Sequence, residues 1–228
     1  MMKQVFIGSF ALCAFAMPAA AQDDGGLAID GYVGVVSDFR DRGLSLSDKD
    51  PAVVASVGAF ADSGFYGGVV GAYFDGTVGA DTKLEFYGGY QIDKGDYIYD
   101  FSVELDTYHG EGSSDLFPEF KASVARDFGL AFVRAGAAYA PDGRWNLPDN
   151  DSLYIFTDLE VPVPTMPELT LIGRIGHDFR QDRSNLWDWG IGLSAFINQV
   201  EVSLMYENSS LDHSAGDGRL VLGARLYF

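Results

Sequence analysis

Three histidines are the residues of this sequence best suited to acid–base catalysis. Asp212, His213 and Ser214 are consecutive and supply the residue types of a serine hydrolase. A working triad places the imidazole between the hydroxyl and the acid, and adjacent residues rarely face each other in that way. His109 lies in an acidic segment, His177 lies near the end of an expected strand, and no HExxH, P-loop or GxSxG motif occurs. We therefore expect no enzyme, and a lipid-modifying hydrolase ranks last among the alternatives.

Acidic residues also gather in the segment 140–151, where Asp142, Asp149 and Asp151 could offer oxygen ligands to calcium. Their spacing is not that of an EF-hand loop, and Pro148 stiffens the chain between them. Solvated loop carboxylates explain these residues better. We expect no metal site and no cofactor.

The other charged residues follow a period of two, which is the period of a β-strand. The segments 97–106, 187–195 and 200–207 confine their charged residues to one face and place apolar residues on the other. The C-terminal segment shows the pattern best, because Leu220, Leu222, Ala224, Leu226 and Phe228 alternate with Arg219, Val221, Gly223, Arg225 and Tyr227. One face suits lipid and the other suits a polar interior, as in a transmembrane strand.

Eight weaker strands complete the pattern, and the connections between strands alternate in length. We place the weaker strands near 27–39, 52–60, 64–74, 82–91, 117–127, 129–139, 152–161 and 168–179. Short turns alternate with longer acidic links at 41–51, 75–81, 107–116, 140–151, 180–185 and 208–217. Such alternation is typical of outer-membrane barrels, which have long extracellular loops and short periplasmic turns. The sequence predicts an all-β protein, an up-and-down transmembrane antiparallel barrel of about twelve strands.

Aromatic residues gather near the ends of the expected strands, where transmembrane barrels carry aromatic girdles at the two membrane surfaces. The residues that we place on the lipid-facing side of these girdles are Phe39, Tyr73, Tyr97, Tyr139, Phe179, Trp187, Trp189, Tyr206 and Phe228.

The inward-facing charges decide the function, because they must face water or one another. By parity, the residues that line the lumen are Asp30, Arg40, Glu85, Asp100, Glu104, Arg134, Arg174, Glu201, Arg219 and Arg225, with Lys83, Glu119, Lys121, Asp158, Glu160 and Asp188 beside them. A barrel of eight strands has an interior filled by side chains, and a barrel of sixteen strands encloses a water-filled channel. A barrel of twelve strands has an interior of intermediate width. Two interpretations remain open: a narrow pore for small ions or solutes, with a weak cation preference because acids outnumber bases, and a closed structural or adhesive barrel.

The N-terminal residues predict export. Lys3, the apolar run 5–16 and Pro18 precede the small residues 19–21, so we expect a signal peptide over residues 1–21, cleavage near Ala21-Gln22 and a barrel domain over 22–228. The only cysteine, Cys13, is removed with this segment, which leaves no thiolate metal site and no disulfide.

The composition bears on partners. The formal net charge is −18, with 33 acidic residues against 15 Lys and Arg, which argues against nucleic acid as a partner. We expect contacts with outer-membrane lipids and lipopolysaccharide, and passage of small ions or solutes, in the bacterial outer membrane.

Arg42 and Gly43 lie just beyond the first expected strand. The guanidinium of Arg42 could fork to carboxylates and fix a loop across the mouth of the barrel, or Arg42 could simply belong to a turn at Gly43.

The segment Ser37-Asp38-Phe39-Arg40-Asp41-Arg42-Gly43-Leu44-Ser45, followed by Ser47 and Pro51-Ala52, resembles the N-terminal signature of the TorF family of bacterial porins, with Phe39 in place of the usual Tyr. This resemblance covers about one strand and loop and implies an outer-membrane barrel with a porin-like role. The terminal Phe228 resembles the C-terminal aromatic residue by which the barrel assembly machinery recognises outer-membrane proteins.

Overall fold

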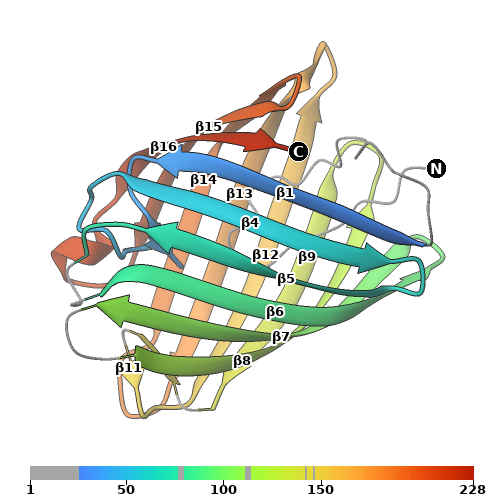
Figure 1. Cartoon of the computed structure of the whole chain (residues 1–228). Coiled ribbons are helices and arrows are strands. Elements are labelled where there is room, and N and C mark those ends of the chain that lie inside the picture. Colours follow the sequence, from blue (N-terminus) through green and yellow to red (C-terminus); the bar gives the residue numbers. More distant parts are fainter. Residues whose placement is uncertain (1–25, 77–79, 111–113, 142, 146) are drawn as a thin grey trace.

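The computed structural model describes residues 26–76, 80–110, 114–141, 143–145 and 147–228. These residues form one closed antiparallel barrel of twelve strands, in which each strand pairs with its sequence neighbours in the barrel and the last strand pairs with the first (Figure 1). The strands are β1 (Leu27–Val36), β4 (Ala52–Ala61), β5 (Phe65–Tyr73), β6 (Ala80–Lys94), β7 (Tyr97–Gly110), β8 (Ser114–Asp127), β9 (Phe132–Ala140), β12 (Ser152–Val163), β13 (Met166–Arg180), β14 (Leu186–Ile197), β15 (Val200–Ser209) and β16 (Arg219–Tyr227). The predicted fold class is confirmed.

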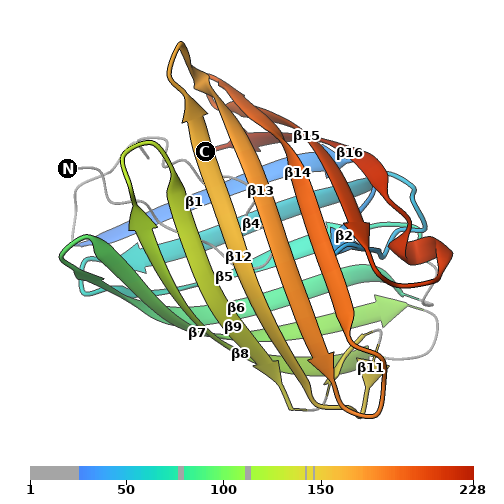
Figure 2. The ribbon, with the colours of Figure 1, turned by 180° about the vertical axis from the view of Figure 1, so that it is seen from behind.

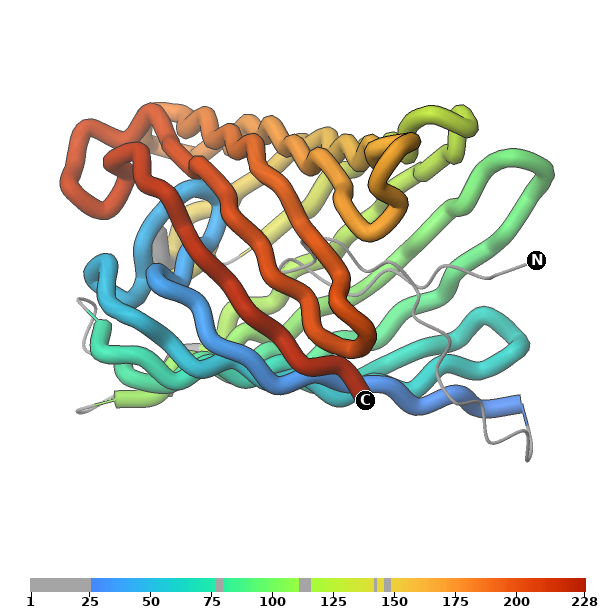
Figure 3. Tube along the Cα trace, turned by 90° about the horizontal axis from the view of Figure 1, so that it is seen from above, coloured from blue at the N-terminus to red at the C-terminus, as the bar shows by residue number. Residues whose placement is uncertain are grey.

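Three small elements complete the chain at one end of the barrel. They are the hairpin of β2 (Arg40–Asp41) and β3 (Leu44–Ser45), the hairpin of β10 (Gly143–Arg144) and β11 (Leu147–Pro148), and the single 3₁₀ turn η1 (Ser214–Gly216). Figure 3 shows the blue loop that carries β2 and β3 at the same end as the red loop of η1. Among the described residues, no helix is long and apolar enough to cross a membrane. The expected signal peptide, its cleavage site and Asp142 lie outside the described residues.

The period of two in the sequence becomes an inner and an outer wall. In β15, Val202 and Leu204 are exposed on the outside, whereas Glu201 and Ser203 are buried inside. Figure 2 shows the tilted strands of the wall that lies behind in Figure 1. Exposed apolar residues and buried polar residues are separated along these strands in the same way. Exposed apolar side chains on the outer face suit contact with lipid, and the charged residues turn to the interior.

The barrel closes where its two ends meet. The backbone N–H of Phe228 donates to the carbonyl of Gly31 (3.0 Å), and the N–H of Gly31 donates to the carbonyl of Phe228 (3.1 Å). Phe228 itself is exposed on the outer wall, 68 % accessible. Phe228 therefore adds one residue pair to the seam between β1 and β16, beyond the pair of Tyr32 and Tyr227.

Two expectations about the ends of the strands were wrong. The segment 107–116 is not a long loop, because β7 continues to Gly110 and β8 begins at Ser114, and the inward residues Asp106 and Tyr108 prolong the alternation. Phe39 is not part of the lipid-facing girdle, because β1 ends at Val36 and Phe39 is 2 % exposed. The other aromatic residues assigned to the girdle are exposed.

Candidate functional site

The loop between β1 and β4 enters the lumen at the end of the barrel where β1 ends, which we call the outer mouth. We call residues 37–51 the inner hairpin. Every residue from 38 to 47 is buried. The turn between β2 and β3 consists of Arg42 and Gly43, with φ values of +48° and +73°. Two-residue hairpin turns of type I′ need positive φ at both positions, which explains the glycine. A Cβ at Gly43 would lie 2.6 Å from the carbonyl oxygen of Asn208, so the turn lies close against β15.

Polar side chains of the inner hairpin hold it in shape from within. Asp38 accepts hydrogen bonds from Arg40 (2.8 Å) and Ser45 (2.6 Å), and the Ser47 hydroxyl accepts from the Phe39 N–H (2.9 Å). Arg40 also donates to the carbonyls of Gly43 (2.5 Å) and Asp217 (3.0 Å). Three residues of the TorF-like signature, Asp38, Ser45 and Ser47, therefore bond to one another. Arg40 lies in this buried loop and not on the wall of the barrel.

An apolar contact fixes the other side of the inner hairpin. The ring of Phe39 stacks on the ring of Phe74, with centroids 5.2 Å apart. Leu46, fully buried, joins them in a cluster with residues of β4 and β5. Burial of this apolar surface stabilises the position of the inner hairpin inside the mouth of the barrel.

An ion-pair cluster ties the inner hairpin to the wall, and we define it as Asp41, Arg42, Glu119 and Arg144. Arg42 donates to both carboxylate oxygens of Glu119 on β8 (2.7 and 2.6 Å). Arg144, from the loop between β9 and β12, donates to Glu119 (2.6 Å) and pairs with Asp41. The guanidinium of Arg42 also lies 3.9 Å from the ring centroid of Tyr154. Arg42 therefore lies in a turn and also bonds to a carboxylate of the wall, with its Nη2 donating to both oxygens of Glu119.

The electrostatics of the cluster favour the ionised forms of its members. Burial raises the pKa of Asp41, but the nearby charges of Arg144, Lys83 and Arg42 together hold that pKa well below its usual range. Burial alone lowers the pKa of Arg144, and the charges of Asp41 and Glu119 raise it well above its usual range. Such a cluster adds little net stability relative to apolar packing, but loss of one partner is costly because it strands a buried charge.

The wall charges predicted from parity fall into two groups. Glu85, Glu104, Glu201 and Arg225 are buried, and each has a charged partner: Lys83, Lys121, Arg225 and Glu201, respectively. Arg134 is partly exposed and donates twice to Asp158 (2.9 and 2.6 Å). Asp30, Asp100 and Arg174 are partly exposed to the lumen, and Arg219 is exposed at the outer mouth opposite Glu207.

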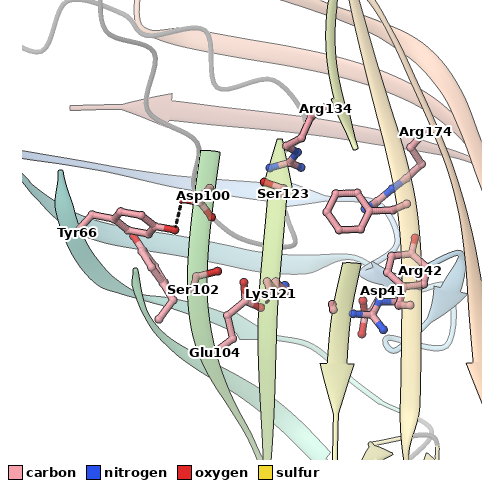
Figure 4. Close-up of a pocket in the computed structure, with 14 residues that line it drawn as sticks. Asp41, Arg42, Tyr66, Asp100, Ser102, Glu104, Lys121, Ser123, Arg134 and Arg174 are labelled. Atoms are coloured by element: carbon pink, nitrogen blue, oxygen red, sulfur yellow. Dashed lines mark hydrogen bonds and ion pairs between the residues drawn. The ribbon is translucent and has the colours of Figure 1, made fainter. Parts of the chain in front are cut away.

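A cavity of about 50 Å³ lies in the lumen beside the inner hairpin (Figure 4). Asp41 and Arg42 reach it from the inner hairpin, Asp100 and Glu104 from β7, and Arg174 from β13. It mixes both signs of charge with aromatic rings, which favours polar occupants over purely apolar ones.

Two features of the interior could not be predicted from the alternation of residues along the strands. Ile172, Met205 and Val221 form a buried apolar cluster on the inner wall, because a Cβ at Gly192 would lie 2.3 Å from the sulfur of Met205 and its absence makes room. The other feature is a cross-strand contact, in which Tyr154 donates to Asp188 (3.0 Å). In the sequence, such a contact is indicated by a glycine at an inward position of the neighbouring strand, because the glycine leaves room for a large side chain.

The histidines considered for catalysis have other contacts, and the structure shows no group of possible calcium ligands among the described residues. His213 accepts a hydrogen bond from the Ala215 N–H (3.2 Å) and caps η1. His177 packs between Phe179 and Trp187 on the outer wall. Across the part of the chain that the structure covers, no group of three or more His, Cys, Asp or Glu residues could hold a metal ion.

Known structures share this architecture. The KdgM porin matches 88 % of this chain and 99 % of its own length, with a TM-score of 0.55 and 9 % identity. A protein from work on in-meso crystallization of membrane proteins matches 87 % of this chain and 83 % of its own, with a TM-score of 0.58 and 13 % identity. At these identities the likeness concerns the fold.

No protein with a curated description matches the sequence. A bacterial family of unknown function, Gcw_chp, matches residues 20–222. The chain belongs to the Gcw_chp family of bacterial proteins.

Proposed function

We propose that this protein is an outer-membrane channel that lets small ions and solutes pass, is narrowed at its outer mouth by the inner hairpin, and prefers cations weakly. The closed barrel with an apolar outer wall supports a transmembrane role. The shared fold with a porin supports passage through the lumen. The narrow bore follows from the buried inner hairpin and its ion-pair cluster.

One observation carries the proposal: acids without an ion-pair partner face the lumen. Asp30, Asp100 and Glu160 are partly exposed on the inner wall, and none has a cationic partner among the described residues. A barrel that served only as a scaffold could neutralise or pair these charges at no cost to its function. Unpaired acids that face water raise the local concentration of cations.

The cation preference rests on these three acids and not on Glu104 and Glu201. Glu104 is bound by Lys121, and Glu201 accepts from Ser194 (2.7 Å) and Tyr227 (2.7 Å) besides Arg225. Both carboxylates are buried, so they contribute little to the field that a passing ion meets.

A closed structural or adhesive barrel is the second candidate, and the ion-pair cluster is the observation that favours it. Arg42 and Arg144 converge on Glu119 from two different loops and so join both loops across the outer mouth. If that junction never opens, the interior is a salt-bridge network and not a path.

The remaining proposals concern export and assembly. We infer that residues 1–21 are a signal peptide cleaved near Ala21-Gln22, and that the mature chain contacts outer-membrane lipids and lipopolysaccharide. The exposed Phe228 at the end of the seam supports recognition by the barrel assembly machinery. The hydrogen bonds among the signature residues Asp38, Ser45 and Ser47 within the inner hairpin support a relation to TorF-family porins.

Reversal potentials in planar bilayers under a salt gradient test the proposal. The purified protein should conduct with a modest cation preference that fades as salt rises, since the Debye length falls to about 3 Å at 1 M. Asp30→Asn, Asp100→Asn and Glu160→Gln together should shift the reversal potential toward anions. The matched control removes three acids from the periplasmic turns (Asp62→Asn, Asp96→Asn, Asp127→Asn) and should shift it less. Inserted protein that carries no current would contradict the proposal.

A further inference from the structure

Four aromatic rings that point into the barrel already have a cation of the protein over one face. The distance from the charged group to the ring centroid is between 3.9 and 5.7 Å for Tyr32 with Arg225, Tyr108 with Lys83, Tyr154 with Arg42 and Phe156 with Arg134. Each of these contacts uses the negative face of the ring. That face is therefore occupied before any cation arrives from solution.

Three inward rings on β4, β5 and β6 differ from these four. The ring centroid of Tyr66 lies 5.6 Å from that of Phe60 and 6.2 Å from that of Tyr87. In the described part of the chain, no arginine or lysine lies over any of these three rings. Tyr87 is buried, whereas Phe60 and Tyr66 are partly exposed. Phe60 and Tyr66 thus present aromatic surface to the lumen that no cation of the protein covers.

A carboxylate meets these rings above Gly58 on β4. A Cβ at Gly58 would lie 2.6 Å from the hydroxyl oxygen of Tyr87, 3.4 Å from the ring of Phe60 and 3.5 Å from Oδ1 of Asp30. Side chains from β1, β4 and β6 therefore converge on one point, within the span of one small solute. Asp30 is partly exposed and has no ion-pair partner among the residues that the structure describes.

A second carboxylate borders the rings on the side of β7. Asp100 accepts a hydrogen bond from the hydroxyl of Tyr66 (2.7 Å), shown by the dashed line in Figure 4. Arg134 and Lys121 lie near Asp100, but each pairs with another carboxylate. The hydrogen bond fixes the ring of Tyr66 and places a second negative charge beside it.

We call Asp30, Phe60, Tyr66 and Tyr87 the acid–aromatic site. Asp30 is near the start of β1, Phe60 near the end of β4 and Tyr66 near the start of β5, so the site lies toward the end of the lumen opposite the inner hairpin. Tyr66 and Tyr87 also line the lumenal cavity, which adjoins the inner hairpin. A solute that passes the inner hairpin therefore meets the acid–aromatic site before it leaves the barrel.

We propose that the acid–aromatic site binds organic cations of the alkylammonium type, with the charged group at Asp30 and the alkyl groups against Phe60 and Tyr66. The proposal rests on the channel function proposed above and names the class of cation that the channel favours. Aromatic faces beside a negative charge are suited to quaternary ammonium groups, whose charge is spread over their alkyl groups. An anion is repelled by the carboxylate, and an uncharged solute gains only the apolar contact.

Block of the potassium current in planar bilayers tests this proposal, with tetramethylammonium as the probe. The wild-type current should fall as the probe concentration rises. Asp30→Asn and Phe60→Leu should each raise the half-blocking concentration several-fold, because each removes one part of the site. Phe60→Tyr keeps the ring and should keep the block. Sodium at the same concentration has the same charge without alkyl groups and should reduce the current far less.

The matched controls change the same residue types elsewhere in the lumen. Phe156→Leu removes a ring that Arg134 already covers, and Glu160→Gln removes a partly exposed acid of β12. Both variants should keep the half-blocking concentration of the wild type. A wild-type current that the probe does not block, or a block that Asp30→Asn and Phe60→Leu leave unchanged, would overturn the site and leave the channel intact. Inserted protein without any potassium current would overturn the channel and this inference with it.

Discussion

Arg42 and Glu119 are 77 residues apart in the sequence, yet the guanidinium of Arg42 donates to both oxygens of the Glu119 carboxylate, at 2.7 and 2.6 Å. This contact joins the turn of the inner hairpin to β8 on the barrel wall. It holds the loop between β1 and β4 inside the barrel, where residues 38 to 47 are buried.

Glu119→Gln should release the inner hairpin. Removing one partner of a buried ion pair costs about 3–5 kcal/mol, here because Arg42 and Arg144 lose their shared carboxylate. Trypsin should then cleave after Arg40 or Arg42, which are buried in the wild-type protein. Mass spectrometry of the fragments gives the site. Glu168→Gln, the same change at an exposed position, should leave Arg40 and Arg42 resistant, and equal resistance of these two sites in both variants would contradict the role of the cluster.

Gly176→Ala should destabilise the barrel by about 1–3 kcal/mol, the usual cost of overpacking. A Cβ at Gly176 would lie 2.0 Å from the hydroxyl oxygen of Tyr154, which must then leave Asp188. Gly173→Ala on the same strand is the matched control, because the nearest atom to its Cβ is 3.9 Å away. Denaturant unfolding in detergent micelles measures both. Equal stability of the two variants would show that Tyr154 is free to move.

Leu222→Arg should cost roughly 2–4 kcal/mol or block assembly, because it places a charge in lipid near the middle of β16. Ser123→Arg is the inward control, since Ser123 is partly exposed and lines the cavity. Val221, the inward neighbour of Leu222, is unsuitable because it belongs to the buried apolar cluster. The band shift of unboiled protein in SDS reports folding. Similar loss of folding in both variants would contradict the division into outer and inner walls.

The pKa of Asp41 gives a pH dependence with a definite sign. The folded-state pKa lies below the ordinary value of about 4, so ionised Asp41 stabilises the cluster fully above that pH, and the stabilisation is lost only as pH falls through the depressed value. The difference in unfolding free energy between wild type and Asp41→Asn should therefore stay constant from pH 7 to pH 5. A difference that shrinks across this window would mean that Asp41 is not held ionised by Arg144.

The walls of the barrel could be predicted because their signal is local. Alternation along β15 and β16 places each residue inside or outside without reference to any other strand. The assignments of Glu201 and Arg225 to the interior needed only parity. Their mutual pairing needed the register between the two strands, which the sequence does not state.

The inner hairpin could not be predicted in this way, and Phe39 shows why. Parity extended from β1 assigns this ring to lipid, but the chain turns inward after Val36. That turn depends on Phe74 and on the partners of Arg42 and Asp41, which lie 77 and 103 residues further along the chain. Contacts between residues so far apart in the sequence produce no periodic pattern in it. The ion pairs of the charged residues around the cavity cannot be predicted from the sequence for the same reason.

Single-channel recording in planar bilayers tests the central claim, that the lumen is a path narrowed by the inner hairpin. Wild-type protein should show a small, steady conductance. A variant in which residues 38–50 are replaced by a short Gly-Ser linker keeps all twelve barrel strands and should show a clearly larger conductance, with Glu119→Gln between the two. If both the wild type and the linker variant insert but carry no current, the lumen is closed by its own wall and the protein is not a channel.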